Sequence, residues 1–391
     1  MSSLRRSAHV VLPALLLTAS ALAPACSAQS SHRPPSAAEG TTPAAAGPAP
    51  DPLDQVDSRL LAGRRIVYSY PGPTPSPAVL RAIREGRAAG VILFGENVTD
   101  LAQLRSSVAQ LRQAAAEAPE PRPLLLMTDQ EGGRIRRLPG APELSARRTG
   151  QAADPAAEAA RSGADAGRTL ADAGLNVNLA PVLDVYDAPD NFIDHHERSY
   201  GQEPSSVARL GSAFLTAQQD LGIAATAKHF PGLGSAAREL NTDERPATLP
   251  VPLAELRARG EEPYRTAIAA GVRLIMASWA VYPALDPDRP AGFSPAVVQG
   301  ELRDRLGFRG VTVTDALEAG ALAAYGDTGA RALAAAAAGM DLLLCSARDA
   351  DQGEAAAAAL AAALDAGSLD RAAFAAAVHR IDDLRATLGG S

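Results

Sequence analysis

Several apolar stretches of this sequence end in side chains that carry charge or exchange protons. Asp129 and Asp184 follow two of these stretches, and Lys228, His229 and Asp315 lie at the ends of two others. The chain has 37 Lys and Arg residues, of which Lys228 is the only lysine. Its compact ammonium group is suited to donating hydrogen bonds to a ligand hydroxyl. The recurrence of such side chains at stretch ends predicts a site for a polar ligand.

These stretches belong to a series of eight apolar runs, at 65–72, 90–98, 123–133, 175–185, 223–232, 272–283, 310–317 and 339–347. Segments between them, such as 203–221 and 252–270, have apolar residues at helical spacing. Continuous apolar strands that alternate with amphipathic helices are typical of a parallel sheet covered by helices. Eight such units predict an α/β fold, a closed (β/α)8 TIM barrel, whose last helices come from the Ala-rich segment 349–388.

An open, doubly wound sheet is the alternative architecture. It would require a glycine-rich phosphate-binding turn after the first strand, and "YSYPGPTPSP" does not have that pattern. In a barrel, the C-terminal ends of all strands meet on one face, which is where functional side chains gather. We therefore expect the polar residues described above to share a single site.

The N-terminus has the features of an export signal. Residues 1–25 contain Arg5 and Arg6, then an apolar run that ends in small residues before Cys26. Cys26 resembles the lipidated cysteine of a bacterial lipoprotein, although cleavage after an A-x-A site is the alternative. Residues 26–56 are rich in Pro, Ala and Ser, which predicts a disordered tether, followed by one folded domain over 57–391.

Composition limits the partners of the chain. The hydrophobic share of 47% and the charged share of 21% are typical of a soluble globular protein with a large core. A formal net charge of −7 without a basic stripe argues against nucleic-acid binding. Contact with a membrane is expected only through the possible lipid anchor at Cys26. The second cysteine, Cys345, lies in an apolar run and predicts a buried thiol rather than a disulfide.

Five motifs in order give the chain a family resemblance: "DQEGGRIRRL" (129–138), "LAPVLDV" (179–185), "ERSYG" (197–201), "KHFPG" (228–232) and "VTVTDAL" (311–317). Together they resemble glycoside hydrolase family 3, specifically its single-barrel branch of β-N-acetylhexosaminidases that act on peptidoglycan sugars. The resemblance covers about residues 57–388. It implies an exported retaining glycosidase without a metal or organic cofactor.

The resemblance also implies roles for individual residues. Asp315 would be the nucleophile that forms a covalent glycosyl-enzyme. The sugar would be held by Asp129, Arg134, Arg198, Lys228 and His229. Carboxylates and cations suit this task because sugar hydroxyls both donate and accept hydrogen bonds.

One residue that the resemblance implies is missing from this sequence. Relatives carry an Asp-Ser-His triplet in the loop after "KHFPGHG", and its histidine is the acid/base. This chain reads "KHFPGLGSAARELNTDERPATLP" there, and it has no histidine between Phe230 and Phe374. Asp243 replaces that histidine if "NTD" is aligned with the triplet, Glu239 is a second candidate, and a loop of merely solvated acids is the third reading.

Two further features leave alternatives open. Trp279, the only tryptophan, could stack on the apolar face of a sugar or fill the core beneath the loops. His195 and His196 lie in "NFIDHHERSYG", where adjacent histidines rarely bind one metal ion together, so a solvated loop is expected.

The sequence thus supports two functions of different classes. The first is an exported retaining glycoside hydrolase that removes terminal β-N-acetylglucosamine from peptidoglycan-derived glycans or muropeptides. The second is a non-catalytic sugar-binding lipoprotein of the same fold, because the acid/base histidine is absent. A phosphorolytic enzyme is disfavoured, since the acidic loop would repel a phosphate anion.

Overall fold

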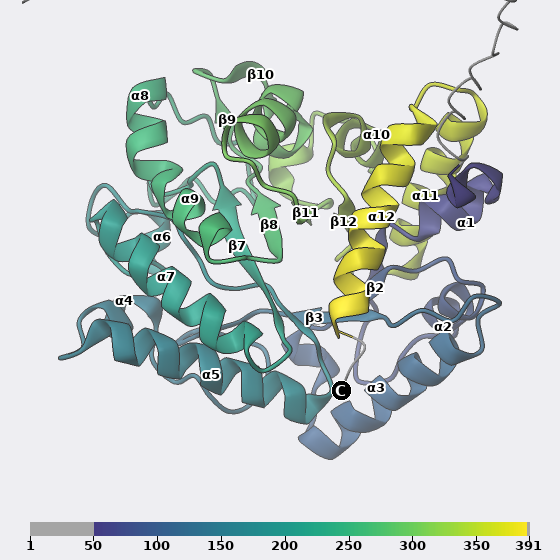
Figure 1. Cartoon of the computed structure of the whole chain (residues 1–391), viewed down its shortest axis with the longest axis horizontal. Helices are drawn as coiled ribbons and strands as arrows, with labels where there is room; N and C mark the ends of the chain where they lie inside the picture. Colours follow the sequence, from purple (N-terminus) through teal and green to yellow (C-terminus); the bar gives the residue numbers. More distant parts are fainter. Residues whose placement is uncertain (1–50, 389–391) are drawn as a thin grey trace, which may run out of the picture. The chain divides into compact units, whose positions relative to one another are not determined.

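A closed barrel of eight parallel strands forms the centre of the computed structural model, which describes residues 51–388 (Figure 1). Its strands are β1 (Ile66–Tyr68), β2 (Gly90–Ile92), β3 (Leu125–Thr128), β6 (Val177–Asn178), β7 (Ala224–Phe230), β8 (Leu274–Ala277), β11 (Val311–Ala316) and β12 (Leu342–Leu344). Each strand pairs with its neighbours along the chain, and β12 pairs with β1 to close the ring. All eight predicted runs contain one of these strands, so the predicted (β/α)8 barrel is confirmed.

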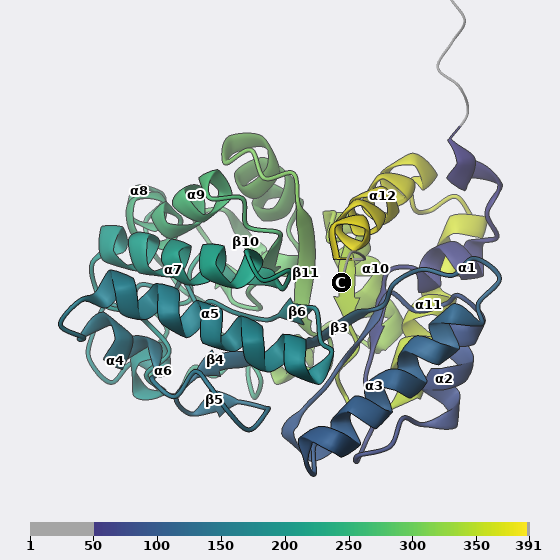
Figure 2. The same ribbon diagram turned by 60° about the horizontal axis from the view of Figure 1, so that its bottom comes forward.

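Long helices surround this barrel. They are α2 (Pro77–Arg84), α3 (Leu101–Ala116), α5 (Pro155–Ala173), α7 (Pro204–Gln219), α9 (Glu262–Ala269), η5 (Ala296–Arg305), α10 (Thr328–Ala338) and α11 (Ala350–Asp365). Helices α5 and α7 lie side by side along one flank (Figure 2). Many of these helices begin at a side chain that accepts a hydrogen bond from the first turn, as Asp100 does for α3 and Asp154 for α5. Such caps satisfy backbone N–H groups that have no partner within the helix.

The last helix, α12 (Arg371–Leu388), closes the N-terminal end of the barrel. Its Ile381, Leu384 and Leu388 pack into the cluster of apolar side chains inside the ring. Arg385 donates a hydrogen bond of 2.8 Å to the Ala89 carbonyl, which directly precedes β2. Because α12 fills this end, the opposite end, where the strands terminate, is the one available for a site.

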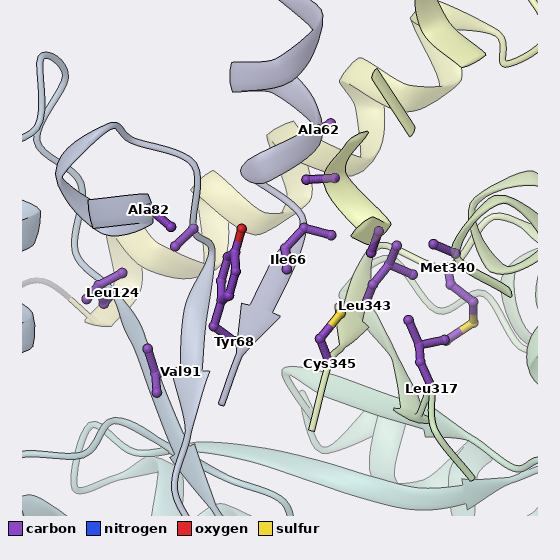
Figure 3. Close-up of a cluster of buried hydrophobic side chains, with 14 of the residues drawn as sticks. Ala62, Ile66, Tyr68, Ala82, Val91, Leu124, Leu317, Met340, Leu343 and Cys345 are labelled. Atoms are coloured by element: carbon purple, nitrogen blue, oxygen red, sulfur yellow. The ribbon is translucent and has the colours of Figure 1, made fainter. Parts of the chain in front are cut away.

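A second apolar layer joins the barrel to its helices. Figure 3 shows Ile66 and Tyr68 of β1 and Leu343 of β12 among side chains from helices α1 (Ser58–Gly63) and α2. Cys345 is fully buried in the same cluster, and burial raises the pKa of its thiol. The predicted buried thiol at Cys345 is therefore confirmed.

Two of the predicted apolar runs each contain a second strand outside the barrel. Run 123–133 ends as barrel strand β3 at Thr128, and its remainder forms β4 (Gln130–Gly132), which pairs antiparallel with β5 (Ile135–Arg136). Run 272–283 likewise divides into β8 and β9 (Val281–Tyr282), which pairs with β10 (Asp286–Pro290). These hairpins lie above the barrel and build part of its C-terminal face.

Short helices complete the connections. They are α4 (Ala146–Gly150), α6 (Phe192–His195), α8 (Leu253–Glu255), η2 (Gly95–Asn97), η3 (Leu256–Gly260), η4 (Ala291–Phe293) and η6 (Gly320–Leu322). Within residues 51–388, no helix combines the length and apolarity needed to cross a membrane.

Strands β7 and β11 each contain one residue more than the strand beside them. Between β7 and β8 the pairing moves from Ala227↔Ile275 to Phe230↔Ala277. Between β11 and β12 it moves from Val313↔Leu342 to Ala316↔Leu344. An extra residue bends a strand and redirects its side chains. The two irregularities fall at Lys228–His229 and at Asp315, the positions singled out from the sequence.

The folded part begins earlier than predicted. Helix η1 (Pro52–Gln55) buries Leu53, and Arg371 donates hydrogen bonds to the carbonyls of Leu53 and Val56. These ordered residues lie before the predicted boundary at residue 57, because an isolated Leu gives no periodic signal yet docks on α12. The predicted signal peptide, Cys26 and most of the tether lie outside the described residues.

Candidate functional site

A cavity of about 470 Å³ opens at the C-terminal end of the barrel strands. Its size lies within the range of about 300–1,000 Å³ that is common for small-molecule sites. Asp129, Arg198, Lys228, His229, Asp243 and Asp315 all line it. A second hollow of about 630 Å³ is lined mainly by apolar and small residues near α3 and the start of β3, with Arg112 and Arg122 as its charged lining. The convergence of charged groups identifies the first cavity as the candidate site.

Lys228 forms the buried centre of the charged network on one wall. Its ammonium lies 2.6 Å from Asp129 Oδ1 and 2.8 Å from Glu131 Oε1, and its side chain is 2% exposed. Burial lowers the pKa of Lys228, but the charges of Asp129 and Glu131 outweigh that effect and raise it overall. Lys228 is therefore a fixed cation. Its ion pairs hold the carboxylates of Asp129 and Glu131 in place along the cavity.

Arg198 and Glu131 form a two-bonded ion pair beside Lys228. Arg198 Nη2 lies 2.7 Å from Glu131 Oε1, and its Nε lies 3.0 Å from Oε2. Burial raises the pKa of Glu131, yet the positive charges of Arg198 and Lys228 hold it well below its usual range. A bidentate pair of this kind fixes both partners in direction as well as in charge.

His229 is oriented by a carboxylate behind the cavity. Its Nδ1 lies 2.8 Å from Oδ2 of Asp184, a side chain that is fully buried. Asp184 Oδ1 also accepts hydrogen bonds from the backbone N–H groups of His229 and Leu233. Because an ionised carboxylate only accepts, the proton of this pair lies on His229 Nδ1. His229 Nε2 lies 3.5 Å from Arg198 Nη2.

Asp315 reaches the cavity from the end of β11. Its Oδ1 accepts a hydrogen bond of 2.8 Å from the backbone N–H of Ala316. Burial, and then the negative charge of Asp243, raise the pKa of Asp315, whereas the charges of His229 and Lys228 lower it. The Asp315 carboxyl thus lies between one negative and two positive neighbours, an arrangement common for reactive carboxyl groups.

Asp243 is brought over the cavity by a loop that is tied to the residues after β11. Gly320 N–H donates to the Asp243 carbonyl at 2.8 Å, and Ala321 N–H donates to the Thr242 carbonyl at 3.0 Å. A Cβ at position 320 would lie 2.2 Å from the Glu244 carbonyl, so only glycine permits this approach. Two segments far apart in sequence therefore hold the Asp243 and Asp315 regions together.

Three residues predicted for the site lie elsewhere. Arg134 is exposed at the turn between β4 and β5, and Glu239 is exposed on the loop before Asp243; neither lines the cavity. Trp279 is 1% exposed and packs against Phe293, so it fills the core and cannot stack on a sugar in this cavity. Each of the three is next to a site element in sequence, but the backbone directs its side chain away.

Five ionisable residues on the cavity wall were not predicted as site residues: Glu131, Arg137, His196, Glu318 and Arg348. Glu131 and Arg137 lie within the quoted motif "DQEGGRIRRL". Because side chains alternate between the two faces of a strand, the position of Glu131 two residues after Asp129 was a signal that could have found it, and the same alternation applies to Arg137. Glu318 is held by Ser346 Oγ at 2.6 Å. Arg348 lies over the Phe94 ring at 4.5 Å and pairs with Glu96. Neither of these two loops carries a sequence signal for a site.

His196 corrects the expectation of a solvated histidine pair. It lines the cavity, whereas His195 pairs with Asp190 outside it at 2.9 Å. Burial, then the positive charges of His195 and Arg198, lower the pKa of His196. His196 is therefore a neutral imidazole at neutral pH and can both donate and accept a hydrogen bond. Among residues 51–388, no group of three or more His, Cys, Asp or Glu side chains is arranged to hold a metal ion.

Comparisons with known proteins agree with this geometry. Residues 59–384 match the family described as glycosyl hydrolase family 3 N terminal domain. An uncharacterised secreted glycosyl hydrolase of Arthroderma benhamiae is 44% identical over 337 residues, which are 86% of this chain and 96% of that protein. A β-hexosaminidase of Stenotrophomonas maltophilia is 33% identical and covers 67% of this chain and 77% of its own length.

Solved structures extend the likeness to three dimensions. A glycoside hydrolase family 3 β-N-acetylglucosaminidase from Paenibacillus superimposes with a TM-score of 0.80 and 35% sequence identity. The match covers 85% of this chain and 63% of the Paenibacillus protein. A β-N-acetylhexosaminidase from Beutenbergia cavernae has a TM-score of 0.77 and 32% identity, covering 85% of this chain and 99% of its own. The chain therefore belongs to glycosyl hydrolase family 3 as a single-barrel glycosidase similar to the β-N-acetylhexosaminidases of that family.

Proposed function

We propose that the chain is an exported retaining glycoside hydrolase that removes terminal β-linked N-acetylglucosamine, with Asp315 as nucleophile and Asp243 as acid/base. The observation that carries this proposal is the pair of carboxyl groups on one cavity, Asp315 at the barrel end and Asp243 on the loop above it. Retaining glycosidases use two carboxyl groups about 5–5.5 Å apart.

In the first step, Asp315 attacks the anomeric carbon while the protonated Asp243 donates its proton to the glycosidic oxygen. The bond between that carbon and oxygen breaks, the leaving group departs as an alcohol, and the sugar becomes an ester of Asp315. In the second step, the Asp243 carboxylate takes a proton from water, and the resulting hydroxide attacks the same carbon. The ester breaks, which releases the sugar and restores both carboxyl groups.

The electrostatics of the pair support this division of roles. Burial and the negative charge of Asp243 raise the pKa of Asp315 overall, so the two carboxyl groups interact through their charges. The positive charges of His229 and Lys228 oppose this rise and favour the anion at the nucleophile. Asp243 is the more exposed of the two, as a proton donor to a departing group must be.

His196 is another group on the cavity wall that can carry a proton. The groups that act most strongly on the pKa of Asp315 include Asp243, His229 and Lys228, but not His196. A group that protonates the leaving oxygen must lie close to the nucleophile, because both act on the same bond. This comparison favours Asp243 over His196 as the acid.

The network around Lys228 supports sugar binding. Asp129 and Glu131 present carboxylate oxygens, while Arg198 and Lys228 present N–H groups, and all four line the cavity. Sugar hydroxyl groups can donate hydrogen bonds to the carboxylate oxygens and accept them from the N–H groups. The relatives from Stenotrophomonas and Beutenbergia are named as hexosaminidases, which is the basis for assigning an N-acetylated hexosamine.

Export and a soluble substrate complete the proposal. The N-terminal segment has a signal pattern with Cys26 as a possible lipid anchor, and the Arthroderma relative is described as secreted. A net charge of −7 disfavours adhesion to anionic wall polymers. Peptidoglycan-derived glycan ends and muropeptides in solution are thus the proposed substrates.

The test is release of nitrophenol from nitrophenyl N-acetyl-β-glucosaminide by the purified protein, with Asp315→Ala as the control. Turnover that disappears in Asp315→Ala, with the β-anomer as the first product seen by proton NMR, is the expected result. Release of the α-anomer would contradict the retaining mechanism.

The alternative is a sugar-binding protein without turnover, which is favoured by one observation: the loop 233–246 contains no histidine. This function predicts that the purified protein binds N-acetylglucosamine in calorimetry but releases no nitrophenol. In that case the same affinity is expected for Asp315→Ala and for the wild-type protein.

A further inference from the structure

Trp279 lies directly behind the end of strand β11. It follows β8, is 1% exposed and does not line the cavity. Its indole Nε1–H donates a hydrogen bond of 2.8 Å to the carbonyl oxygen of Ala316. Ala316 directly follows Asp315 in the chain. The only tryptophan of the sequence is therefore bonded to the peptide group next to the proposed nucleophile.

The Trp279 ring is held firmly from its other side. Its centroid lies 4.7 Å from that of Phe293, at an interplanar angle of 57°. Gly292 packs so closely that a Cβ there would lie 2.5 Å from Trp279 Cζ3. The Gly292 N–H bonds to the Ser278 carbonyl at 3.2 Å, which ties this segment to the end of β8. A ring enclosed in this way keeps its N–H in one direction.

The acceptor of this bond belongs to the irregular part of β11. Between the pairs Val313↔Leu342 and Ala316↔Leu344, β11 contains one residue more than β12. An extra residue disrupts the regular ladder of a sheet and leaves backbone groups in need of other partners. The Ala316 carbonyl accepts hydrogen bonds from Trp279 Nε1 at 2.8 Å and from the backbone N–H of Ala319 at 3.2 Å. The indole thus stabilises the local backbone shape that turns Asp315 toward the cavity.

The same residue connects directly to the carboxylate. The Ala316 N–H donates to Asp315 Oδ1 at 2.8 Å, so Ala316 is bonded at its carbonyl to Trp279 and at its amide to Asp315. Moving the Ala316 backbone therefore moves the nucleophile. We propose that Trp279 is a positioning residue, which through Ala316 holds the Asp315 carboxylate in the orientation required for attack on the anomeric carbon. This inference rests on the proposed role of Asp315.

A purely structural role for Trp279 makes a different prediction. A ring that only fills space would stabilise the fold, and its replacement would lower the melting temperature without changing the chemical step. A positioning role acts on the step in which Asp315 attacks, because small displacements of a reacting group strongly reduce its rate. Sugar binding in the ground state relies on the Lys228 wall and should be preserved.

The experiment compares Trp279→Phe with Tyr264→Phe as the matched control. Trp279→Phe keeps an aromatic ring and removes the N–H donor. Tyr264 is also fully buried, and its hydroxyl has no hydrogen-bond partner among residues 51–388, so removing it breaks no bond within that part of the chain. Both variants are assayed with nitrophenyl N-acetyl-β-glucosaminide well below their melting temperatures, and inhibition by N-acetylglucosamine measures binding.

For Trp279→Phe, kcat is expected to fall by about tenfold or more, while the inhibition constant of N-acetylglucosamine stays within about twofold. Tyr264→Phe should match the wild-type protein in both. A value of kcat for Trp279→Phe within about twofold of wild type, whatever its melting temperature, would overturn the inference.

A second measurement does not need turnover. Because Trp279 is the only tryptophan, its fluorescence reports directly on the group bonded to Ala316. A pH titration of this fluorescence should show a transition that disappears in Asp315→Asn but persists in Glu239→Gln. If the wild-type protein releases no nitrophenol, the proposed function fails, and this titration alone decides the positioning role. A transition unchanged by Asp315→Asn, or none in the wild-type protein, would overturn it.

Discussion

Asp243 lies on a loop and Asp315 at the end of strand β11, yet they line one cavity and interact through their charges. The negative charge of Asp243 raises the pKa of Asp315, and backbone hydrogen bonds from Gly320 and Ala321 hold the Asp243 loop against the segment that follows Asp315. This pairing places a second carboxyl group in the loop where the family resemblance implies a histidine. The predictions below test this pair and the groups around it.

Replacing Asp243 by Asn should separate substrates by their leaving groups. Without a proton donor, kcat/KM for poor leaving groups such as a second sugar should fall by about 100-fold or more. Dinitrophenyl glycosides, whose leaving group departs without a proton, should react at nearly the wild-type rate in the first step. Steady-state kinetics on both substrates measure this difference.

Glu239→Gln is the matched control for that experiment, because Glu239 is exposed on the same loop and does not line the cavity. It should behave as wild type with both substrates. Equal losses on both substrates in Asp243→Asn would contradict the acid role, and His196→Asn would then be the next variant to measure.

The pH dependence of Asp243→Asn should also change. Because the charge of Asp243 raises the pKa of Asp315, removing that charge lowers the pKa. The nucleophile then remains ionised at more acidic pH. The acidic limb of kcat/KM for a dinitrophenyl glycoside is expected to move to lower pH than in the wild-type protein. A limb that stays in place or moves to higher pH would show that the two carboxyl groups do not interact.

Replacing Arg137 should affect substrate binding far more than replacing Arg134, although both residues belong to one motif. Arg137 lines the cavity and its Nε lies 3.8 Å from Asp129 Oδ2, whereas Arg134 is exposed at the hairpin turn. Arg137→Ala should weaken substrate binding and raise KM by about tenfold, while Arg134→Ala leaves KM unchanged. Michaelis–Menten kinetics of both variants decide this, and a larger effect for Arg134→Ala would show that the sugar reaches the turn.

Gly320→Ala should disturb the acid while leaving the nucleophile in place. The new Cβ would collide with the Glu244 carbonyl and push the loop carrying Asp243 away. We expect kcat/KM for poor leaving groups to fall by about tenfold, with a smaller loss for dinitrophenyl glycosides.

Gly300→Ala is the control for that variant, since no atom lies within 4 Å of a Cβ at position 300. This exposed helical site should gain up to about 1 kcal/mol of stability and keep its activity. If Gly320→Ala retained full activity on poor leaving groups, the contact between loop and η6 would have no role in placing Asp243.

Lys228→Met should destabilise the fold as well as abolish sugar binding. It would leave Asp129 and Glu131 close together without the cation that lies 2.6 Å and 2.8 Å from them. Removing one partner from a buried ion pair costs about 3–5 kcal/mol of unfolding free energy. Urea denaturation measures this loss.

The control is Arg84→Met, because Arg84 and Glu117 form an exposed pair at 3.0 Å, whose loss should change the free energy of unfolding far less. Similar losses in the two variants would show that the Lys228 network contributes little to folding.

The sequence by itself determined the barrel and the ends of its strands. Apolar runs and amphipathic segments alternate locally along the chain, and in a parallel barrel this alternation sends every strand end to one face. That reasoning was sufficient to bring Asp129, Lys228, His229 and Asp315 to a single cavity. The sequence also shows that no histidine lies between Phe230 and Phe374, where the resemblance implies one.

Only the tertiary structure decided which loop residues join them. Asp243 enters the cavity and Glu239 does not, because Gly320 and Ala321 bond to the backbone at Thr242 and Asp243 from a distant part of the chain. Trp279 faces the core instead of the ligand, and its indole N–H bonds there to the Ala316 carbonyl in the irregular part of β11. Register shifts and contacts between distant loops leave no local periodic pattern, so no reading of neighbouring residues could reveal them.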